Sequence, residues 1–255
     1  MAAYTRQDAL VFRDWLVDRG LTGSSVTRNF SYVKAVINFA LSAFALDVRN
    51  PFVGVYHDRS KGVVSRKPIP LYDLRSVQRE CMQIDDDIRW LVALVSDTGM
   101  RLAEAAGLSV SDFNLQGDIP FVEVRPHPWR SLKTSASERV IPLSGMALWA
   151  AQRILQEVGT SSHAFPRYNR GSRTSANSAS AAINKWLKNH VPEGCTMHSF
   201  RHSMRDRLRS VECPSDIVDQ IGGWTSGTIG TSYGNGFGAD VLHKWLQKVD
   251  LHSAS

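Results

Sequence analysis

Cysteine, long apolar runs and signal sequences are scarce or missing in this sequence of 255 residues. The three cysteines, Cys81, Cys195 and Cys213, are odd in number and far apart, which argues against a disulfide framework and favours a reducing compartment. No stretch approaches the run of about 18 apolar residues that a membrane span needs, and charged residues come too early at the N-terminus for a signal peptide. We therefore expect a cytoplasmic protein that does not enter a membrane.

A second set of absences concerns cofactors. The sequence contains no G-x-x-x-x-G-K-[ST] loop, no G-x-G-x-x-G turn after a strand and no H-E-x-x-H helix. His198 and His202 have the spacing of two zinc ligands on a helix, but no cysteine or carboxylate close by in the sequence completes a site. Ser31 and Lys34 match a β-lactamase nucleophile motif without its companion motifs. The sequence thus predicts no metal and no cofactor.

What is present is a globular composition with an uneven charge. Hydrophobic residues make up 43% and charged residues 21%, which is enough apolar material for a packed core. The net charge of +6 is concentrated, because residues 151–210 hold ten basic and three acidic residues while the rest holds 20 basic and 21 acidic. A basic stretch on a near-neutral background is typical of a protein that binds a phosphate backbone, although a solvated surface can have the same composition.

The apolar periodicity predicts a mainly α protein with a small antiparallel β-sheet. We expect helices at 5–19, 24–46, 71–82, 86–96, 144–158, 176–190, 197–211, 215–221 and 239–249, and strands at 121–124 and 139–143. The first two helices are too few to enclose a core, so residues 1–56 form a partial helical domain or one that a partner completes. A basic linker at 57–70 and a larger domain at 71–255 follow, the latter with a Ser/Arg-rich loop at 160–175.

Several dispersed residues suit phosphate chemistry, although each alone has an ordinary structural explanation. Arginines grip phosphate oxygens through paired donors, a histidine or indole N–H donates one more hydrogen bond, and a tyrosine can act as a nucleophile. An Arg follows a glycine turn with a Glu three residues on, a Lys precedes the second strand, and a His and an Arg are spaced i, i+3 on one helix. The set is Arg101, Glu104, Lys133, His198, Arg201, Trp224 and Tyr233.

In this order and spacing, the set resembles the tyrosine recombinases, or phage integrase family. The family pattern is an Arg in a T-G-x-R-x-x-E turn, a Lys on a β-hairpin, an H-x-x-R helix, a His or Trp, and a Tyr nine residues later. Its counterparts here extend from about residue 70 to Tyr233. The resemblance implies a tyrosine-recombinase-like catalytic domain, preceded by a partial core-binding domain at 1–56. It also implies that Arg101, Lys133, His198, Arg201, Trp224 and Tyr233 are catalytic and that Glu104 supports them.

The implied function is that of a site-specific DNA recombinase, the integrase of a phage or another mobile element. It would cut and rejoin DNA through a 3′-phosphotyrosine intermediate, with Tyr233 as nucleophile and Lys133 as acid, and without metal or ATP. The implied partners are a double-stranded recombination site, further copies in a homotetramer on DNA and an accessory DNA-bending protein, which places the protein at the nucleoid. The candidates for contacts to the DNA backbone are Arg59, Lys61, Arg66, Lys67, Arg170 and Arg173.

Three alternatives stay open on the sequence. A type IB topoisomerase-like enzyme would use the same chemistry to relax DNA, and a catalytically silent module would bind DNA without cutting it. A zinc-binding helical regulator would use His198 and His202. The apolar stripe of the helix at 239–249 leaves a further choice, because that helix docks either on its own domain or on a neighbouring protomer.

Overall fold

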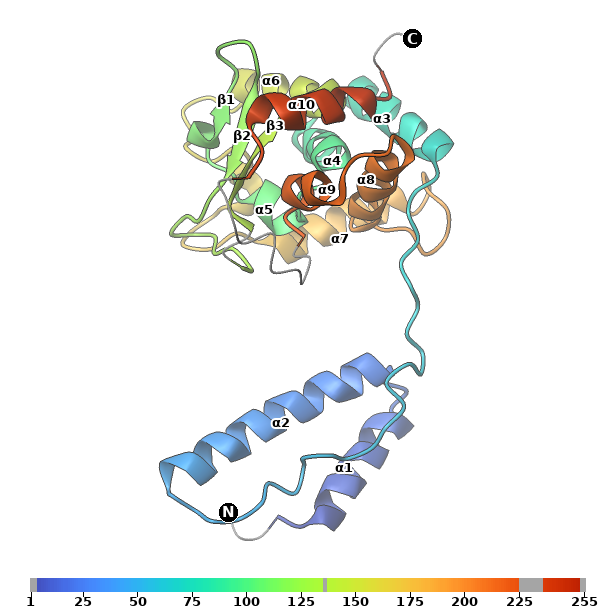
Figure 1. Cartoon of the computed structure of the whole chain (residues 1–255), viewed down its shortest axis with the longest axis vertical. Coiled ribbons are helices and arrows are strands. Elements are labelled where there is room, and N and C mark those ends of the chain that lie inside the picture. Colours follow the sequence, from blue (N-terminus) through green and yellow to red (C-terminus); the bar gives the residue numbers. More distant parts are fainter. Residues whose placement is uncertain (1–3, 135–136, 225–235, 253–255) are drawn as a thin grey trace. The chain divides into compact units, whose positions relative to one another are not determined.

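The computed structural model describes residues 4–134, 137–224 and 236–252. The chain divides into two compact units, Met1–Ser65 (unit 1) and Arg66–Ser255 (unit 2), both drawn in Figure 1. No helix of the described ranges is long and apolar enough to cross a membrane.

Unit 1 is a pair of helices, α1 (Arg6–Asp18) and α2 (Gly23–Ala43). Thr5 caps α1, since its side chain accepts from the Asp8 N–H while the Asp8 carboxylate accepts from the Thr5 N–H. The two helices share a small apolar core whose buried members are Ala9, Leu16, Val26, Phe30, Ile37, Phe52 and Val55. Two helices therefore suffice for a core here only because the chain after α2 adds Phe52 and Val55 to it.

The segment after α2, which includes the start of the predicted linker at 57–70, also makes contacts within unit 1. His57 stacks on Phe30 with ring centroids 5.8 Å apart, and its Nε2 lies 2.7 Å from the Thr27 hydroxyl. The Gly23 N–H donates to the Lys61 carbonyl at 2.8 Å. At the other end, Ile69 is buried in unit 2. Residues 58–68 are exposed, and the contacts of His57, Lys61 and Ile69 fix this segment near both of its ends.

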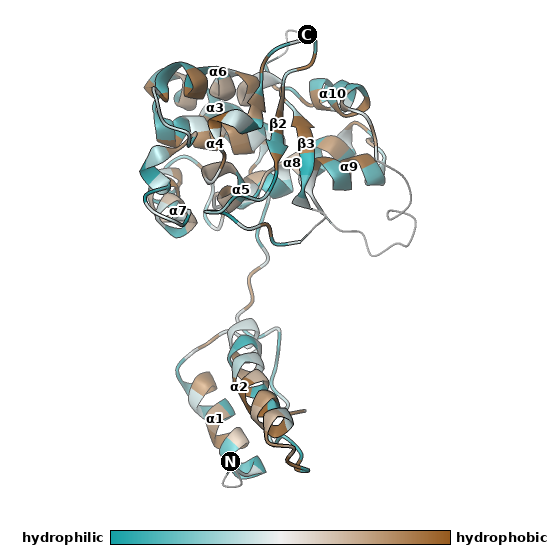
Figure 2. Ribbon diagram, turned by 90° about the vertical axis from the view of Figure 1, so that its left-hand side faces the viewer, coloured by the Kyte–Doolittle hydropathy of each residue, from teal (hydrophilic) through white to brown (hydrophobic). Residues whose placement is uncertain are grey.

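One face of α2 carries large apolar side chains that nothing in the described residues covers. Tyr32, Val36 and Phe39 are 65%, 66% and 76% exposed, and they lie opposite the buried Phe30 and Ile37. Figure 2 shows hydrophobic residues along the length of α2. A helix that is apolar on two faces normally lies inside a larger bundle.

Unit 2 surrounds one central helix. Its helices are α3 (Leu71–Ile84), α4 (Asp87–Thr98), α5 (Leu102–Ala106), α6 (Gly145–Glu157), α7 (Ala176–Leu187), α8 (Ser199–Ser210), α9 (Ser215–Gly222) and α10 (Ala239–Lys248), with 3₁₀ turns η1 (Val110–Asp112) and η3 (Pro166–Tyr168). Every residue of α4 from Leu91 to Thr98 is buried, and Figure 1 shows the other helices arranged around it. The predicted helices are confirmed to within a few residues at their ends.

The sheet has three antiparallel strands in the order β1 (Phe113–Asn114), β2 (Phe121–Val124) and β3 (Arg139–Pro142). Val122 pairs with Ile141 and Val124 with Arg139. The strand β1 was not predicted, because two residues are too short to show alternation. The predicted fold class, mainly α with a small antiparallel sheet, is confirmed.

The helix α10 docks on its own unit. Leu242, Leu246 and Val249 are buried, and the helix packs against β3. The Arg207 guanidinium, buried in an ion pair of 2.9 Å with Asp97, also donates to the Val249 carbonyl. Of the two dockings that the sequence left open, the structure shows the one within the chain.

Candidate active site

Arg101 is presented by a turn between α4 and α5. Gly99 ends α4 in the left-handed conformation at φ +63°, which glycine adopts without steric cost. Arg101 then begins α5, and the Glu104 carboxylate reaches back to accept from the Arg101 N–H at 2.9 Å. The T-G-x-R-x-x-E spacing thus builds a short capped helix that fixes the position of Arg101.

Glu104 is the buried carboxylate at the centre of the site. Its two oxygens accept from the Arg101 guanidinium at 2.6 Å and from the Arg139 guanidinium at 3.0 Å. Burial alone would raise the pKa of the Glu104 carboxyl, but the charges and hydrogen bonds of Arg139 and Arg101 outweigh it and hold that pKa below its usual value. Glu104 is therefore ionised, and it orients two arginines at once.

Arg201 lies on the first turn of α8 and is only 4% exposed. Its guanidinium donates to the carbonyls of Gly99 and Gly222, and no carboxylate of the described ranges lies within ion-pair distance of it. Burial and the nearby charge of Arg101 lower the Arg201 pKa to about 10, so the group is still charged at neutral pH. Arg101 and Arg139 thus share one carboxylate, and Arg201, which donates to Gly222 as Arg101 does to Gly223, adds a further positive charge nearby. The excess positive charge can receive an anion.

Trp224 follows α9 through two glycines that the structure requires. A side chain at Gly222 would place its Cβ 1.9 Å from the Trp224 ring, and Gly223 has φ +62° and lies against the Arg139 guanidinium. The Arg201 and Arg205 guanidiniums lie 4.8 and 5.2 Å from the centroid of the Trp224 ring. The indole ring therefore makes cation–π contacts with both arginines, and its single N–H can donate one hydrogen bond.

His198 occupies the N-cap position of α8, three residues before Arg201, and its side chain is exposed. Partial desolvation of its ring, followed by the positive charges of Arg66, Arg201, His202 and Arg101, lowers the His198 pKa to about 4. The imidazole is therefore neutral at physiological pH in the protein without DNA. A neutral ring still donates one N–H.

Lys133 is exposed on the connection between β2 and β3, in agreement with the hairpin position of the family pattern. The connection is joined to the arginines through Ser137, whose hydroxyl accepts from Arg101 at 3.1 Å and whose carbonyl accepts from Arg139 at 2.6 Å. The lysine thus lies four residues from a direct contact with Arg101.

Tyr233 lies outside the described residues, but the chain on both sides of it is held by α9. The Trp224 N–H donates to the Asp219 carbonyl at 3.0 Å. On the other side, Phe237 and Gln220 exchange two hydrogen bonds of 2.8 and 2.9 Å.

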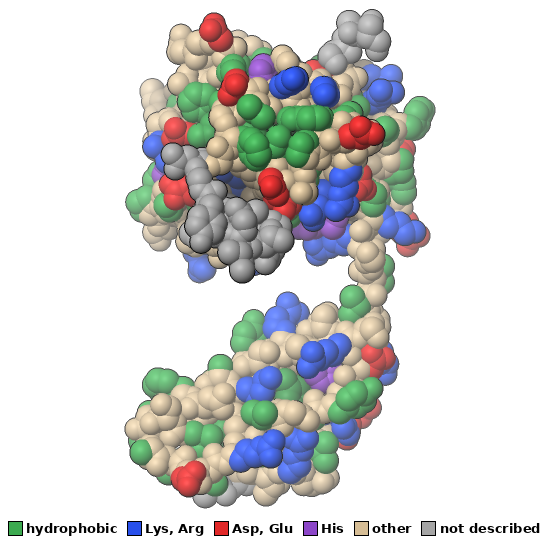
Figure 3. All heavy atoms as spheres, in the orientation of Figure 1, with side chains coloured by type: hydrophobic (Ala, Val, Ile, Leu, Met, Phe, Trp, Pro, Cys, Tyr) green, Lys and Arg blue, Asp and Glu red, His purple; other side chains and the backbone are tan. Residues whose placement is uncertain are grey.

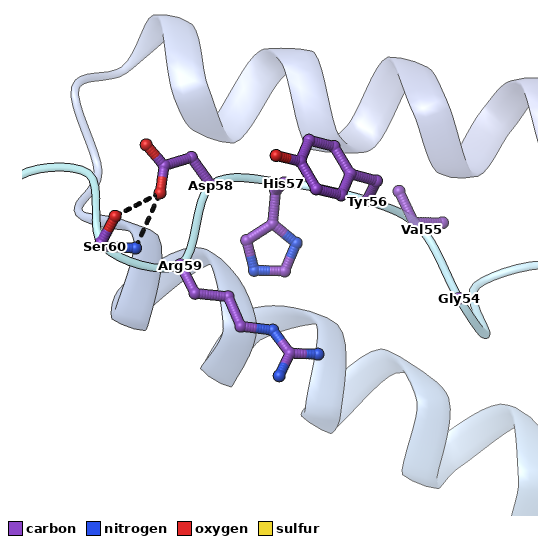
Figure 4. Close-up of a pocket in the computed structure, with 7 residues that line it drawn as sticks. All are labelled: Gly54, Val55, Tyr56, His57, Asp58, Arg59 and Ser60. Atoms are coloured by element: carbon purple, nitrogen blue, oxygen red, sulfur yellow. Dashed lines mark hydrogen bonds between the residues drawn. The ribbon is translucent and has the colours of Figure 1, made fainter.

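The six residues predicted to contact the DNA backbone are all exposed, and none forms an ion pair with a carboxylate of the described ranges. Arg59 and Lys61 belong to unit 1, where Figure 4 shows the Arg59 side chain beside a hollow lined by Gly54–Ser60. Other basic residues of the 151–210 stretch are neutralised by neighbours, as Arg153 is by Asp85. Figure 3 shows Lys and Arg side chains on the visible faces of both units. The charge available to DNA is therefore smaller than the sequence count indicates.

Sequence reasoning missed Arg139 and Ser137. Arg139 pairs with a residue 35 positions away, a relation that no local spacing shows. One signal was available, since the alternation of β3 places Arg139 on the same face as the buried Ile141. A charged residue at an inward position needs a charged partner, and this would have indicated a buried ion pair.

Comparisons with known proteins agree with this geometry. The sequence profile of the phage integrase family matches residues 74–236, well over half of the chain. The chain therefore belongs to the phage integrase family.

A curated relative is tyrosine recombinase XerD of Corynebacterium glutamicum, 28% identical over 146 residues, which cover 55% of this chain and 45% of that protein. The match thus spans less than half of the relative's length.

Two solved structures share the fold. One is the Tn1549 transposon integrase (residues 82–397) in complex with circular intermediate DNA, at a TM-score of 0.64 and 16% identity, with 90% of this chain and 84% of that chain covered. The other is a lambda integrase tetramer bound to a Holliday junction, also at 0.64 and 16%, with 91% and 64% covered.

Proposed function

We propose that this protein is a site-specific DNA recombinase, the integrase of a phage or another mobile element. The observation that carries the proposal is a pair of guanidiniums on one carboxylate, Arg101 and Arg139 on Glu104, next to a third, Arg201, that is buried and has no acidic partner in the described ranges. A buried cation is costly unless a negative charge compensates it. A phosphodiester of DNA supplies that charge, and its non-bridging oxygens match the paired donors of Arg101 and Arg201.

The reaction is an in-line displacement at phosphorus. The Tyr233 hydroxyl gives its proton to solvent water and its oxygen attacks, so that a bond from phosphorus to the tyrosine forms while the bond to the 5′-oxygen breaks. Lys133 gives a proton to the departing 5′-oxygen. Arg101 and Arg201 stabilise the charge on the non-bridging oxygens in the transition state, and Glu104 keeps Arg101 in place. The 3′-phosphotyrosine conserves the bond energy, so a second 5′-hydroxyl can reverse the step on another strand without ATP.

His198 and Trp224 complete the phosphate site. Because the His198 pKa is lowered to about 4, the ring approaches DNA in its neutral form and donates one N–H. Trp224 holds Arg201 through its ring face and directs its own N–H to the phosphate. The bound phosphate brings negative charge, which favours protonation of His198 once DNA is in place.

Unit 1 and the exposed basic residues of unit 2 both bind the DNA backbone. Unit 1 acts as the later part of a core-binding domain, with Arg59 and Lys61 toward the backbone, while Arg66, Lys67, Arg170 and Arg173 extend the contact from unit 2. The protein acts as a homotetramer with an accessory DNA-bending protein, in the cytoplasm at the nucleoid. The lambda integrase tetramer on a Holliday junction, which shares the fold, supports the assembly.

The test is capture of the covalent intermediate. The full chain is incubated in EDTA with duplexes tiled across the ends of the element that carries the gene, each nicked so that the short product with the free 5′-hydroxyl diffuses away. We expect a protein–DNA adduct on denaturing electrophoresis that Tyr233→Phe abolishes while DNA binding is kept. Tyr72→Phe, at a 78% exposed tyrosine of the same unit, is the matched control and keeps the adduct.

Other outcomes separate the alternatives. Binding without an adduct identifies a catalytically silent DNA-binding module, and the absence of binding excludes a nucleic-acid function. Relaxation of a supercoiled plasmid that contains none of the tiled sites identifies a topoisomerase-like enzyme. An adduct that persists in Tyr233→Phe shows that another residue is the nucleophile.

A further inference from the structure

Lys133 has no side-chain contact in the described residues that would fix its position. Its side chain is exposed and none of the described residues forms a hydrogen bond or ion pair with it. A proton donor has to lie within hydrogen-bond distance of the departing oxygen, and small displacements from a productive geometry reduce rates strongly. The backbone that carries Lys133 therefore has to be held in place by other residues.

A closed turn at residues 127–130 fixes the backbone on the N-terminal side of Lys133. His127 and Arg130 exchange backbone hydrogen bonds of 2.9 and 3.0 Å. Pro126 and Pro128 flank His127, and each fixes its own φ near −65°. The turn is thus stiff before any side-chain contact is counted.

Aromatic side chains attach this turn to the body of unit 2. The His127 ring is parallel to the Trp129 ring, with centroids 4.6 Å apart, and its Nε2 lies 2.7 Å from the buried Asp112 carboxylate. The Trp129 indole N–H donates to the Gly107 carbonyl at 3.0 Å. Gly107 comes directly after α5, the helix that Arg101 begins.

Arg130 is the strongest attachment. It is 4% exposed, and its guanidinium donates to the Glu104 carbonyl at 2.6 Å and to the Arg125 carbonyl. Its side chain passes so close to Gly107 that a Cβ there would lie 2.6 Å from the Arg130 Cδ. The turn is therefore fixed to the backbone of the residue whose carboxylate holds Arg101.

The far end of the connection is held by the arginines themselves. Ser137 accepts from Arg101 and Arg139, as described above, and Leu132 packs against the core of unit 2. Lys133 thus lies between two fixed points, Arg130 three residues before it and Ser137 four residues after it. Arg130 is hydrogen-bonded to the backbone of Glu104, and Ser137 is hydrogen-bonded to the side chain of Arg101. Both ends are therefore attached to the ion pair of Arg101 and Glu104.

We infer that Arg130 and Trp129 are positioning residues that hold Lys133 at the departing 5′-oxygen. The inference rests on the proposed function, because Lys133 needs a defined position only if it donates a proton in strand cleavage. It distinguishes these two residues from Glu104, which acts on the phosphate-binding arginine.

The chemistry of the leaving group separates these roles. A duplex with sulfur in place of the 5′-bridging oxygen releases a thiolate, and a thiol has a pKa of about 8.5, so it leaves without a proton donor. With the oxygen duplex, we expect Lys133→Ala to slow adduct formation by about 10²- to 10⁴-fold, the usual contribution of general acid catalysis, and the sulfur duplex to restore most of the rate. Arg130→Met should show the same pattern with a loss of at least about tenfold, and Trp129→Phe a smaller one, because it removes one hydrogen bond and keeps the ring.

The control is Arg207→Met. Arg207 is also 4% exposed and also donates to a backbone carbonyl, but it lies in α8 and holds the C-terminal segment. It should lose stability as Arg130→Met does, and any loss of rate should be the same for oxygen and sulfur. Rates are measured at saturating full-length protein, below the melting temperature of each variant.

Equal losses on both duplexes in Arg130→Met or Trp129→Phe would overturn the inference, since these residues would then act through Arg101 or through the fold. Unchanged rates on the oxygen duplex would overturn it as well. If Arg130→Met does not fold, the inference is tested on Trp129→Phe alone, by the ratio of its rates of adduct formation with the oxygen and the sulfur duplex. The failure of the proposed function looks different, because the unaltered chain would then form no adduct with either duplex.

Discussion

The two units differ in how completely they cover their apolar side chains. Among the residues that the structure describes, nineteen large hydrophobic side chains are exposed, and thirteen of them belong to unit 1, which holds only about a quarter of the chain. Unit 2 encloses its core around α4 and satisfies buried charges in pairs such as Asp97 with Arg207. Unit 2 thus has the enclosed core of a complete domain, whereas unit 1 leaves one apolar face of α2 exposed.

This difference shows where each part of the function resides. All described residues of the candidate site, together with the carboxylate and carbonyls that hold them, come from unit 2. Unit 1 contributes basic residues and an uncovered apolar face. We expect substitutions in unit 2 to act on the chemistry, and substitutions in unit 1 to act on its own stability and on DNA binding.

The largest effect is expected from Arg201→Ala. Loss of an arginine that stabilises charge on a transferring phosphoryl group costs on the order of 10³-fold or more in rate. The fold should survive, because the variant removes a buried cation that has no acidic partner in the described part of the chain. The measurement is the rate of adduct formation, with a thermal melt of the same sample.

Arg209→Ala is the matched control for this prediction. Arg209 lies on the same helix, but its side chain is 61% exposed. The rate should change by less than about threefold, since surface substitutions rarely have larger effects. A similar loss in both variants would show that the charge of α8, rather than the position of Arg201, matters.

A smaller effect separates the two faces of α2. Phe30→Ala removes a ring that is 3% exposed in the core of unit 1 and should cost about 3–5 kcal/mol. Phe39→Ala, at a 76% exposed position, should change the free energy of unfolding by about 0.5 kcal/mol or less. Calorimetry should show that only the transition of unit 1 moves. Equal destabilisation by both variants would mean that the face of Phe39 is covered in solution.

The smallest effect is a dependence of unit 2 on pH. The His198 pKa is lowered to about 4 in the folded protein, below its ordinary value of 6.5. The unfolded chain therefore binds the proton first, so the stability of unit 2 falls as the pH is lowered from about 6.5 to about 4. His198→Gln should reduce this fall in melting temperature, in the transition of unit 2 only. Identical pH profiles of the variant and the unaltered chain would contradict the assignment.

Much of the site could be predicted because its signals are local. The turn that carries Arg101 and Glu104, and the i, i+3 pair of His198 and Arg201, each lie within one helical turn, where spacing determines neighbours. The helices followed from the 3.6-residue period for the same reason.

The rest depended on contacts between distant segments. Arg139 reaches Glu104 across 35 residues, and Arg130 reaches the Glu104 carbonyl across 26, so neither is visible in a local pattern. The contacts of the predicted linker at 57–70 are of the same kind. Its basic composition indicates exposure, but the stacking of His57 on Phe30 attaches its first residues to unit 1.

The most direct test of the account identifies the residue that carries DNA. The captured adduct is digested with nuclease and trypsin and analysed by tandem mass spectrometry. Residues 210–244 form one tryptic peptide whose single tyrosine is Tyr233. We expect a nucleotide attached through phosphate to this tyrosine. A nucleotide on any of the other five tyrosines, or on a different residue type, would contradict it.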